Sequence, residues 1–418
     1  MLAATDKPVI ESLLDVDFYK FTMGQMIFHR HPAVPVKFAF HSRSRGVRLA
    51  HAVDAGELRA SLDHLRGLRF TAAELHYLGG TFQYGRRMFH EDYIRYLRDF
   101  QLCDYHLAAR DGQLVLEFAG AWPQAGLWET LALAVVNQLY MQGQMRGRSR
   151  FQRDLVTDEG HRRLAEKIRL LRQRPDVTFS DFGTRRRASR AWQDYLVGVL
   201  AEELPPEQFR GASNTALAMK YGLTAMGTNA HELPMVYSGI YYDEDERDPL
   251  VSQRRVLADW EAEYGLGLSI FLADTWGSDW FFRHAVTPQQ LRAWKGSRHD
   301  SGDPIAYGEK RIADYRAAGI DPLTKLLVFA DSLDVPLMLR LADHFRGRIG
   351  VTFGLGTNLT NDLGLPTLSI VAKPVEACGH PVAKLSDNLE KATGEPAAIA
   401  RMKRLAGYTL AYAAECRY

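Results

Sequence analysis

A short stretch near residue 300 combines the side-chain types that bind a phosphorylated sugar. It reads Arg298-His299-Asp300-Ser301-Gly302-Asp303-Pro304, so one arginine and two aspartates share a tight turn. Arginine presents a rigid fork of donors that matches phosphate or carboxylate oxygens, whereas aspartate suits sugar hydroxyls and hard metal ions. Taken alone, the stretch fits equally well a surface turn whose charges neutralise one another. The rest of the chain favours the binding site because it repeats the theme.

The middle of the chain alternates short apolar runs with amphipathic segments, which is typical of parallel βα units. The predicted strands are 177–180, 222–226, 268–272, 326–329, 349–353 and 368–371. Polar or glycine-rich loops follow the first five of them, at 181–187, 227–232, 273–279, 330–334 and 354–358. Active sites of α/β barrels are built at the carboxyl ends of strands, whereas an open doubly wound sheet concentrates its ligands at one switch point. So many contributing loops favour a barrel.

We expect three segments along the chain. Residues 1–125 read as an α+β domain, with helices near 19–29, 57–68 and 91–100 and strands near 34–40 and 113–118. Residues 126–375 form the barrel, the catalytic domain. The tail, 376–418, carries a hairpin signal with Gly379 at its turn and is expected to pack with the N-terminal domain.

Composition excludes several classes of protein. The 418 residues are 46% hydrophobic and 24% charged, which is ordinary for a globular protein. A net charge of +2 attracts neither nucleic acid nor an anionic membrane, and the three cysteines, Cys103, Cys378 and Cys416, make neither a metal motif nor a disulfide framework. No apolar run reaches the ~20 residues of a membrane helix, and the first residues do not resemble a signal peptide. We expect a cytoplasmic protein.

Two of the loops could bind anions. Gly354, Gly356 and Thr357 offer backbone N–H groups and a hydroxyl to a phosphate, although a tight strand-to-helix turn is the simpler interpretation. In the other loop, Phe182 precedes Arg185 by three residues, so the aromatic ring could stack on a flat ligand while the arginine holds its anionic group.

His231 follows a Gly-Thr turn and precedes Glu232 in the loop after the second predicted strand. A lone histidine is more often structural than functional. Its imidazole could also serve as a general base, a metal ligand or a nucleophile toward phosphorus. Spacing alone does not choose among these roles.

Taken together, the motifs resemble those of the bacterial type of nicotinate phosphoribosyltransferase, a type II phosphoribosyltransferase. The matching segments are Asp-Phe-Gly-Thr-Arg-Arg at 181–186, Gly-Thr-Asn-Ala-His-Glu at 227–232, Arg-His-Asp-Ser-Gly-Asp-Pro at 298–304, Phe-Gly-Leu-Gly-Thr-Asn-Leu-Thr at 353–360, Lys-Leu-Ser-Asp at 384–387 and Ser-Leu-Leu-Asp-Val-Asp-Phe-Tyr-Lys at 12–20. The resemblance covers essentially the whole chain in the expected order. It implies an irregular α/β barrel with an α+β domain formed by the N-terminal region and the C-terminal tail.

The resemblance also implies a reaction. Nicotinate and phosphoribosyl pyrophosphate would give nicotinate mononucleotide and pyrophosphate, the first step of NAD biosynthesis from nicotinate by salvage. ATP hydrolysis would be coupled to the transfer, as in an ADP-forming ligase, through a phosphohistidine at His231. ATP and Mg²⁺ would be required, and the active sites would lie at the interface of a homodimer, with no part for nucleic acid or membrane.

Carried over residue by residue, the resemblance assigns roles to most of the candidates. Those expected to act on the ribose, the leaving pyrophosphate and ATP are His231, Asp300, Arg298 and Asp303. Those expected to hold nicotinate are Tyr19, arriving from the partner subunit, together with Phe182, Arg185 and Arg298. Phosphate and ribose contacts are expected from Arg43, Gly354, Gly356, Thr357, Lys384 and Lys391, partly across the dimer interface. Asp300 and Asp303 are also the carboxylates that could hold Mg²⁺.

Some questions stay open at the level of sequence. The related nicotinamide-using enzymes carry an arginine where this chain has Asn361, so that phosphate contact is not expected, and selectivity for nicotinate over nicotinamide is only partly supported. A barrel isomerase or aldolase acting on a sugar phosphate would share the phosphate loop, with Glu232 as its candidate catalytic residue. A nucleic-acid-binding protein is suggested by the arginine-rich segments 146–150 and 185–187, but net charge and aromatic content oppose it.

Overall fold

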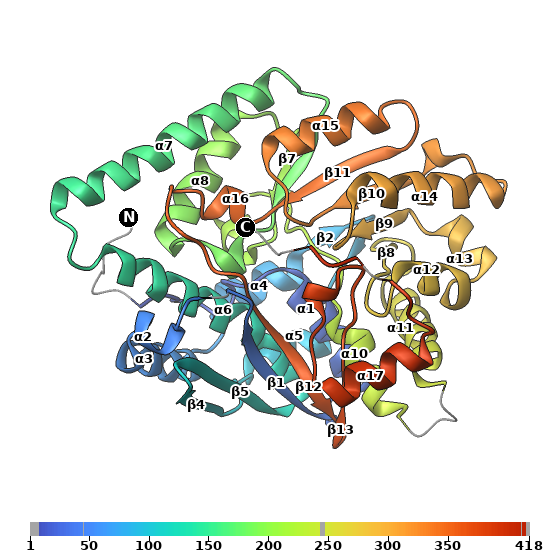
Figure 1. Cartoon of the computed structure of the whole chain (residues 1–418), viewed down its shortest axis with the longest axis horizontal. Helices are drawn as coiled ribbons and strands as arrows, with labels where there is room; N and C mark the ends of the chain where they lie inside the picture. Colours follow the sequence, from blue (N-terminus) through green and yellow to red (C-terminus); the bar gives the residue numbers. More distant parts are fainter. Residues whose placement is uncertain (1–7, 45, 243–246, 411, 415–418) are drawn as a thin grey trace.

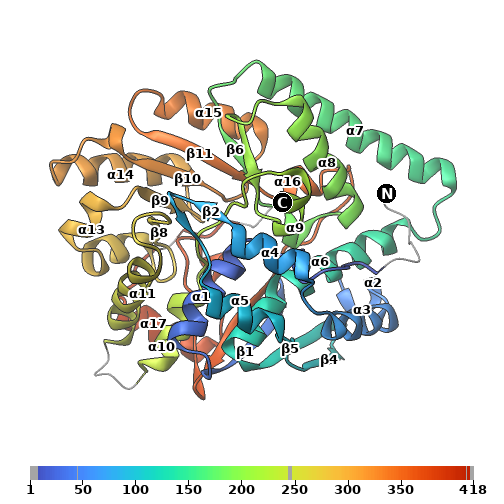
Figure 2. The ribbon, with the colours of Figure 1, turned by 180° about the vertical axis from the view of Figure 1, so that it is seen from behind.

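The computed structural model describes residues 8–44, 46–242, 247–410 and 412–414. Its strands form two main sheets, one antiparallel and one parallel, with a small two-stranded ribbon beside them. The antiparallel sheet occupies one half of the molecule and the parallel sheet the other, and helices cover both (Figures 1 and 2). This is the mixed α/β architecture that the sequence predicts.

The antiparallel sheet combines strands from the N-terminal third of the chain with strands from its C-terminal region. Its strand order is β13-β12-β1-β5-β4. The bounds are β1 Pro35–Ser42, β4 Tyr105–Arg110, β5 Gln113–Ala121, β12 Ile370–Ala377 and β13 His380–Pro381. On β1, Val36, Phe38 and Phe40 are buried and alternate with more accessible residues, the period-2 pattern of a sheet with one face on the core.

The C-terminal hairpin is confirmed. Strands β12 and β13 are joined by Cys378 and Gly379, whose φ angles of 53° and 79° are those of a type I′ turn. Because β12 pairs with β1 over seven register positions, from Val36 opposite Ala377 to Ser42 opposite Ile370, the C-terminal region completes the N-terminal sheet. The rest of the tail also contacts the catalytic segment, since Arg401 pairs with Asp248 and Ala383 packs with Trp276. The expected packing of the whole tail with the N-terminal domain stays a prediction.

Helices of the first third pack around that sheet. The bounds are α1 Tyr19–Arg30, α2 Leu49–Ala52, α3 Ala55–Gly67, α4 Ala72–Gly80, α5 Glu91–Arg98 and α6 Trp122–Met145, with the ribbon strands β2 Phe82–Gln83 and β3 Arg86–Arg87. Helix α6 is buried on nearly all sides and contacts β1, β5, β12 and α1, so its sequence is apolar almost throughout.

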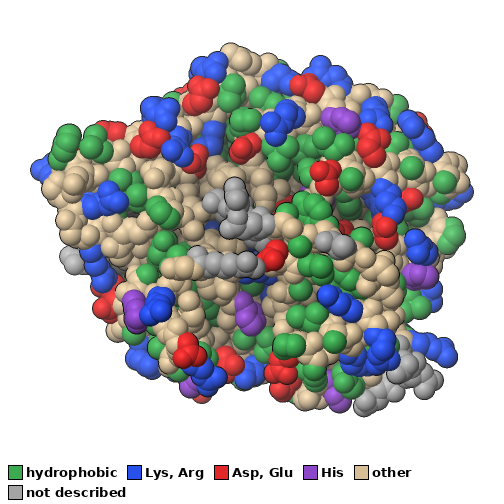
Figure 3. Space-filling model, viewed as in Figure 1, with side chains coloured by type: hydrophobic (Ala, Val, Ile, Leu, Met, Phe, Trp, Pro, Cys, Tyr) green, Lys and Arg blue, Asp and Glu red, His purple; other side chains and the backbone are tan. Residues whose placement is uncertain are grey.

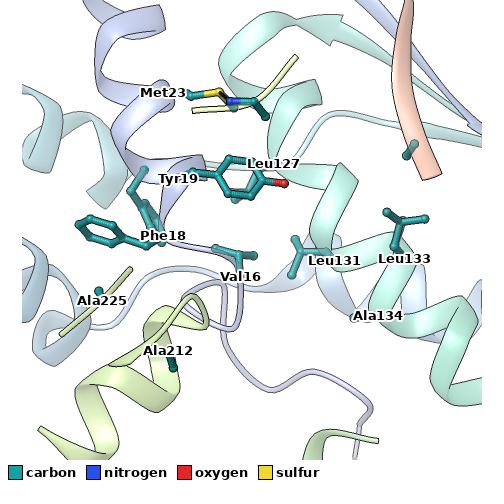
Figure 4. Packing of buried hydrophobic residues seen from close by; sticks show 14 of the residues in the cluster. Val16, Phe18, Tyr19, Met23, Leu127, Leu131, Leu133, Ala134, Ala212 and Ala225 are labelled. Atoms are coloured by element: carbon teal, nitrogen blue, oxygen red, sulfur yellow. Dashed lines mark hydrogen bonds between the residues drawn. The ribbon is translucent and has the colours of Figure 1, made fainter. Parts of the chain in front are cut away.

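Residues just before and at the start of α1 anchor this helix in the core. Val16 and Phe18 are fully buried, and Figure 4 shows Tyr19 directed toward the helix that carries Leu127 and Leu131. Packing fixes where α1 begins, and that matters because Tyr19 is one of the candidate ligand-binding residues.

The parallel sheet has the order β7-β6-β11-β10-β9-β8. The bounds are β6 Phe179–Asp181, β7 Phe209–Ala212, β8 Ile270–Leu272, β9 Gly296–His299, β10 Leu326–Phe329 and β11 Gly350–Leu355. Among the described residues the end strands β7 and β8 are not paired with each other, so the barrel is not closed by hydrogen bonds. The N-terminal segment contributes at one of these ends, where Asp17 bridges to Asn214 just after β7.

Helices and short helical turns connect or flank these strands. The helices are α7 Arg150–Arg172, α8 Arg190–Glu203, α9 Thr215–Tyr221, α10 Glu232–Ile240, α11 Asp248–Tyr264, α12 Ser278–Trp280, α13 Pro288–Ala293, α14 Pro304–Ala317, α15 Val335–Phe345, α16 Thr357–Thr360 and α17 Pro396–Leu405. The turns are 3-10 turns at Thr184–Arg186, Pro322–Thr324 and Leu389–Lys391 and a π-helical turn at Phe281–Ala285.

Two strand predictions and one turn prediction need correction. Residues 222–226 form no strand beyond a bridge at Ala225, because Gly222 at φ 63° ends α9; the real strand is Phe209–Ala212. Residues 368–371 lead into β12, which belongs to the antiparallel sheet. Arg298 lies on the strand β9 rather than in a turn.

The proposed domain boundaries at 125 and 375 stay predictions, and they fall inside α6 and β12 respectively.

Two surface properties bear on partners. No helix in the described ranges is both long and apolar enough to cross a membrane. On the face drawn in Figure 3, lysine and arginine side chains are interspersed with aspartate and glutamate. That face therefore lacks the single-sign patch that a nucleic-acid-binding surface needs.

Candidate active site

One open cavity lies at the carboxyl ends of the parallel strands. The volume of the cavity, including the part that is open to solvent, is ≈ 1210 Å³. The predicted site residues that line it come from both ends and the middle of the chain: Tyr19, Arg43, Phe182, Arg185, His231, Arg298, Asp300, Gly354, Gly356, Thr357, Lys384 and Lys391. Segments more than three hundred residues apart in sequence therefore meet in one place.

Asp303 is the predicted site residue that the structure leaves out of this cavity. It caps the N-terminus of α14, where its Oδ1 accepts a hydrogen bond from the Ala306 N–H at 2.7 Å, and its side chain is exposed. Capping explains the aspartate without a ligand. The metal or ribose contact expected of Asp303 is not supported.

Arg298 and Asp300 reach the cavity from the end of β9. The Arg298 Nη1 donates to the carbonyl of Asn229 at 3.1 Å, and its Nε lies 3.6 Å from Asp300 Oδ1. The Arg298 charge helps to hold the pKa of the Asp300 carboxyl well below its usual range despite burial. Asp300 is therefore ionised where a sugar hydroxyl or a cation could meet it.

His231 is held from both sides of its ring. Its Nδ1 is 3.0 Å from the Thr275 hydroxyl, and its Nε2 is 3.0 Å from Asp300 Oδ2 and 3.3 Å from Asp274 Oδ1. Since carboxylates only accept, the ring proton belongs on Nε2, and Nδ1 accepts from the Thr275 hydroxyl. Burial lowers the pKa of His231 to about 4, although the two carboxylates act in the opposite direction. The imidazole is neutral at pH 7.

Two aromatic side chains, Tyr19 and Phe182, line the cavity, and we call the part that they line the aromatic slot. Phe182 lies over the backbone of Gly354, where an added Cβ would come within 2.2 Å of the Phe182 ring. The Arg185 guanidinium stands 5.9 Å from the centre of the Tyr19 ring. Tyr19 reaches the cavity of its own chain, so the expectation that it must come from a partner subunit is not supported.

A buried ion network lies behind this slot. Glu129 has its Oε2 2.6 Å from Lys20 Nζ and its Oε1 2.6 Å from Lys373 Nζ. Arg185 Nη1 is 3.6 Å from Glu129 Oε1, and Glu232 accepts from Lys20 at 2.5 Å. Burial disfavours the Glu129 charge, but Lys20 and Lys373 hold the pKa of its carboxyl below the usual range. The network fixes the base of the slot electrostatically.

Three cations, Arg43, Lys384 and Lys391, line the cavity that the glycine-rich loop 354–357 also lines, and we call them the cationic wall. Lys391 Nζ donates to the Asp300 carbonyl at 2.9 Å and pairs with Asp331. Arg43 donates to the Lys391 carbonyl at 2.8 Å, and Lys384 Nζ lies 3.3 Å from Asp274 Oδ2. All three cations belong to the same chain as the cavity. They provide the positive charge that phosphate groups require.

Asn361 does not line the cavity. Its Nδ2 donates to the Arg186 carbonyl at 3.0 Å, and its side chain is buried. This side chain therefore holds the backbone at Arg186 and is not part of the cavity wall.

Two protein-family profiles match this chain. A profile of the nicotinate phosphoribosyltransferase (NAPRTase) family matches residues 177–409, and a profile of the NAPRTase N-terminal domain matches residues 14–137. The chain belongs to the nicotinate phosphoribosyltransferase family. The resemblance seen in the motifs is thereby confirmed.

Solved structures of family members agree over almost the full length. The nicotinate phosphoribosyltransferase of Vibrio cholerae is 33% identical with a TM-score of 0.84, and the match covers 98% of this chain and 96% of that one. The enzyme of Porphyromonas gingivalis is 30% identical with a TM-score of 0.82, covering 95% of this chain and 100% of that one. Membership of the family supports phosphoribosyl transfer to nicotinate in NAD biosynthesis. The isomerase and nucleic-acid interpretations find no support.

Several residues that line the cavity, belong to the ion network or contact His231 were not predicted from the sequence. They are Asp17, Glu129, Asn229, Asp274, Thr275 and Lys373. A signal existed for two of them, because Glu129 interrupts the apolar run 125–136 and Lys373 interrupts the apolar run 368–375. A charge in an apolar segment must be paired or functional. Asp274 and Thr275 stood in a predicted strand-end loop, but nothing in the sequence showed that they contact His231.

Proposed function

We propose that this protein transfers the phosphoribosyl group of phosphoribosyl pyrophosphate to nicotinate, giving nicotinate mononucleotide and pyrophosphate, and that ATP hydrolysis drives the transfer through a phosphohistidine at His231. The observation that carries the proposal is the 3.0 Å contact between His231 Nε2 and Asp300 Oδ2 inside the cavity that also holds the aromatic slot and the cationic wall. A phosphorus nucleophile and a ribose-binding carboxylate would thus share one cavity.

Nicotinate would lie in the slot between Tyr19 and Phe182. An aromatic ring is favoured there by stacking, and a carboxylate on that ring is favoured by Arg185 and Lys373 at the base of the slot. Both cations contact Glu129, which holds them in place. Nicotinamide lacks the negative charge that these two side chains attract. The slot therefore favours nicotinate.

Asp300 would act on the ribose. When the bond between C1 and pyrophosphate breaks, the ribose gains positive charge, and an ionised carboxylate near its hydroxyls stabilises that charge. Departing pyrophosphate takes the electron pair of the broken bond and gains negative charge. Arg298, Lys384, Lys391 and the N–H groups of the 354–357 loop would receive it.

His231 would be the site of phosphorylation by ATP. Because Asp274 and Asp300 face Nε2, the proton stays there and Nδ1 carries the lone pair that attacks the terminal phosphorus. An Nδ1–P bond forms as the bond to the ADP oxygen breaks, and the two carboxylates stabilise the positive charge on the ring. The Thr275 hydroxyl, which donates to Nδ1, must turn aside.

Mg²⁺ is the expected metal, and the side chains suit it. Asp300 is part-exposed to the cavity, and Asp274 Oδ1 is a buried oxygen without a hydrogen-bond partner among the described residues. Carboxylate oxygens are the ligands that Mg²⁺ prefers. These two aspartates would hold it, and when bound it would supply positive charge to the substrate phosphates. A homodimer is also expected of the family, although every site residue predicted from the sequence except Asp303 lines the cavity within one chain.

Transfer of label from ATP tests the proposal. The protein is incubated with Mg²⁺ and ATP carrying a radioactive terminal phosphate, and label on the protein is measured after base and after acid treatment. We expect base-stable, acid-labile label that His231→Asn lacks, together with nicotinate mononucleotide formation that persists weakly in His231→Asn without ATP consumption. Equal labelling of the variant would refute the role of His231, and absence of nicotinate mononucleotide from the unaltered protein would refute the reaction.

A further inference from the structure

We propose that His29, His90 and Asp92 form a binding site for a divalent transition metal ion such as Zn²⁺. None of the three residues lines the catalytic cavity. His29 lies in the last turn of α1, whereas Tyr19 opens that helix, so the two ends are about 15 Å apart along the axis. This site is therefore separate from the cluster of His231, Asp274 and Asp300.

The donor atoms are already close together. One ring nitrogen of each histidine and a carboxylate oxygen of Asp92 all lie within 4.8 Å of one another. His29 Nε2 is 3.3 Å from Asp92 Oδ2 and 3.4 Å from Oδ1. Two ligands bound tetrahedrally to Zn²⁺ at about 2.0–2.1 Å are separated by about 3.3–3.4 Å. His29 and Asp92 thus stand at the spacing that a tetrahedral ion requires, and the His90 side chain is exposed, so its ring can turn toward the ion.

Regular elements hold the three residues. His90 immediately precedes α5 and Asp92 lies in its first turn. The backbone here is tied to α1, because Gln25 Oε1 accepts from the His90 N–H at 2.7 Å and Gln25 Nε2 donates to the Met88 carbonyl at 3.1 Å. The site therefore rests on two helices whose relative position is fixed, as precise ligand geometry demands.

A second carboxylate orients His29. Glu263, whose side chain is only 5% exposed, has its Oε1 2.9 Å from His29 Nδ1. The Nδ1 proton is then donated to Glu263, and the Nε2 lone pair points toward Asp92. This is the carboxylate–histidine arrangement found behind metal-bound imidazoles, where it fixes the tautomer and raises ligand basicity.

An imidazole between two carboxylates needs a positive charge on its second nitrogen. A proton would satisfy His29 alone, as an ordinary ion pair. A metal ion would satisfy His29 and Asp92 together and would also use the neighbouring ring of His90, whose centre lies 5.2 Å from that of His29. His29 and Asp92 can form a protonated ion pair without the second imidazole, whereas a metal ion would use it as a third ligand, so its presence favours a metal. Two nitrogens and one oxygen suit Zn²⁺, Co²⁺ or Ni²⁺ rather than Mg²⁺.

Zinc titration of the full-length protein tests this site. The protein is freed of metals, placed in excess Mg²⁺ so that carboxylate sites in the catalytic cavity are occupied, and titrated with Zn²⁺ by calorimetry. His90→Ala removes a ligand at an exposed position, and His106→Ala, an exposed histidine on β4, is the matched control. Glu263→Gln keeps all three ligands and alters only the orienting carboxylate.

We expect one equivalent of Zn²⁺ that His106→Ala retains and His90→Ala loses. Glu263→Gln should weaken the affinity by about 10–100-fold. X-ray absorption of the zinc complex should show two imidazole nitrogens at about 2.0–2.1 Å. Unchanged binding in His90→Ala would overturn the proposal, as would an equal loss in His106→Ala. Transferase activity without added Zn²⁺ should be the same in His90→Ala as in the unaltered protein.

Discussion

Lys20 and Glu232 form a buried ion pair, with Lys20 Nζ 2.5 Å from Glu232 Oε2, and each is the sequence neighbour of a cavity residue. Lys20 follows Tyr19, and Glu232 follows His231. One ion pair therefore ties the start of α1, which carries a wall of the aromatic slot, to the start of α10, which carries the proposed phosphorylation site. The Thr22 hydroxyl adds a second tie by donating to the Thr228 carbonyl at 2.7 Å.

Removing the cation of this pair should destabilise the fold strongly. Lys20→Met leaves the carboxylates of Glu129 and Glu232 buried with one partner fewer, and loss of one member of a buried pair costs about 3–5 kcal/mol. Urea unfolding measures the change. Lys37→Met is the control, since the Lys37–Glu117 pair is partly exposed and should contribute less than about 1 kcal/mol. Equal losses of the free energy of unfolding in the two variants would show that the buried network does not stabilise the fold more than a surface ion pair does.

Asp300→Asn should abolish most of the transfer while leaving the fold intact. The amide keeps the shape of the side chain but loses the charge that stabilises the ribose, and loss of one such electrostatic contact costs about 10²–10³-fold in kcat. Turnover and the thermal midpoint are measured on the same preparation. A variant that turns over normally would show that the carboxylate does not act on the ribose.

Gly354→Ala should impair nicotinate binding. The added methyl group would meet the Phe182 ring at 2.2 Å, so the ring must move, and overpacking of this kind costs about 1–3 kcal/mol. The KM for nicotinate should rise more than that for phosphoribosyl pyrophosphate. In a Phe182→Ala background the same glycine substitution should have little further effect. Additive losses in the double variant would show that the ring and the glycine do not interact.

The labelling of His231 should be insensitive to pH over the range in which ordinary histidines titrate. Burial lowers the pKa of His231 to about 4, so the ring stays neutral and nucleophilic well below pH 6.5. Lowering the pKa favours the unprotonated form in the fold, hence the stability contributed by this group is complete above pH 6.5 and is lost as the pH falls toward 4. The initial rate of labelling between pH 8 and pH 5.5, quenched in base, checks this. A rate that halves near pH 6.5 would contradict it.

Nicotinate affinity should fall as the pH rises above neutrality. Burial lowers the pKa of Lys373 to about 8, so this lysine loses its charge, and with it the attraction for a carboxylate, as the pH passes 8. The KM for nicotinate measured from pH 7 to pH 9 should therefore rise. In Lys373→Met it should be high throughout and should not vary in this way. A parallel rise in both proteins would exclude Lys373 as the cause.

The sequence predicted the parts of the site that depend on local chemistry. The loop 227–232 and the turn around Asp300 stood out because their residue types are unusual for a turn, and family motifs assigned their roles. Hydrophobic patterning found strands such as 326–329 and the hairpin at Gly379. It failed for β7, since Arg210 and Gly211 in the middle of that strand hide its apolar signal.

Contacts between distant segments were beyond reach of the sequence. The pairing of Glu129 with Lys373 joins residues 244 positions apart, and the contact of Asp274 with His231 depends on where two loops end in space. The expected role of Asp303 found no support for a different reason, which is local. The same residue type caps helices and binds metals, and Pro304 after it already indicated the start of a helix.

The pairing of β1 with β12 makes the cavity a late product of synthesis. Strand β1 can pair early with β5 on one side, but its neighbour on the other side, β12, follows more than three hundred residues later in the chain, and Lys384 and Lys391 come later still. A nascent chain that stops short of them has neither a completed sheet nor a cationic wall. The chain should consequently bind phosphates only once nearly the whole polypeptide is free to fold. Incomplete chains should be inactive rather than weakly active.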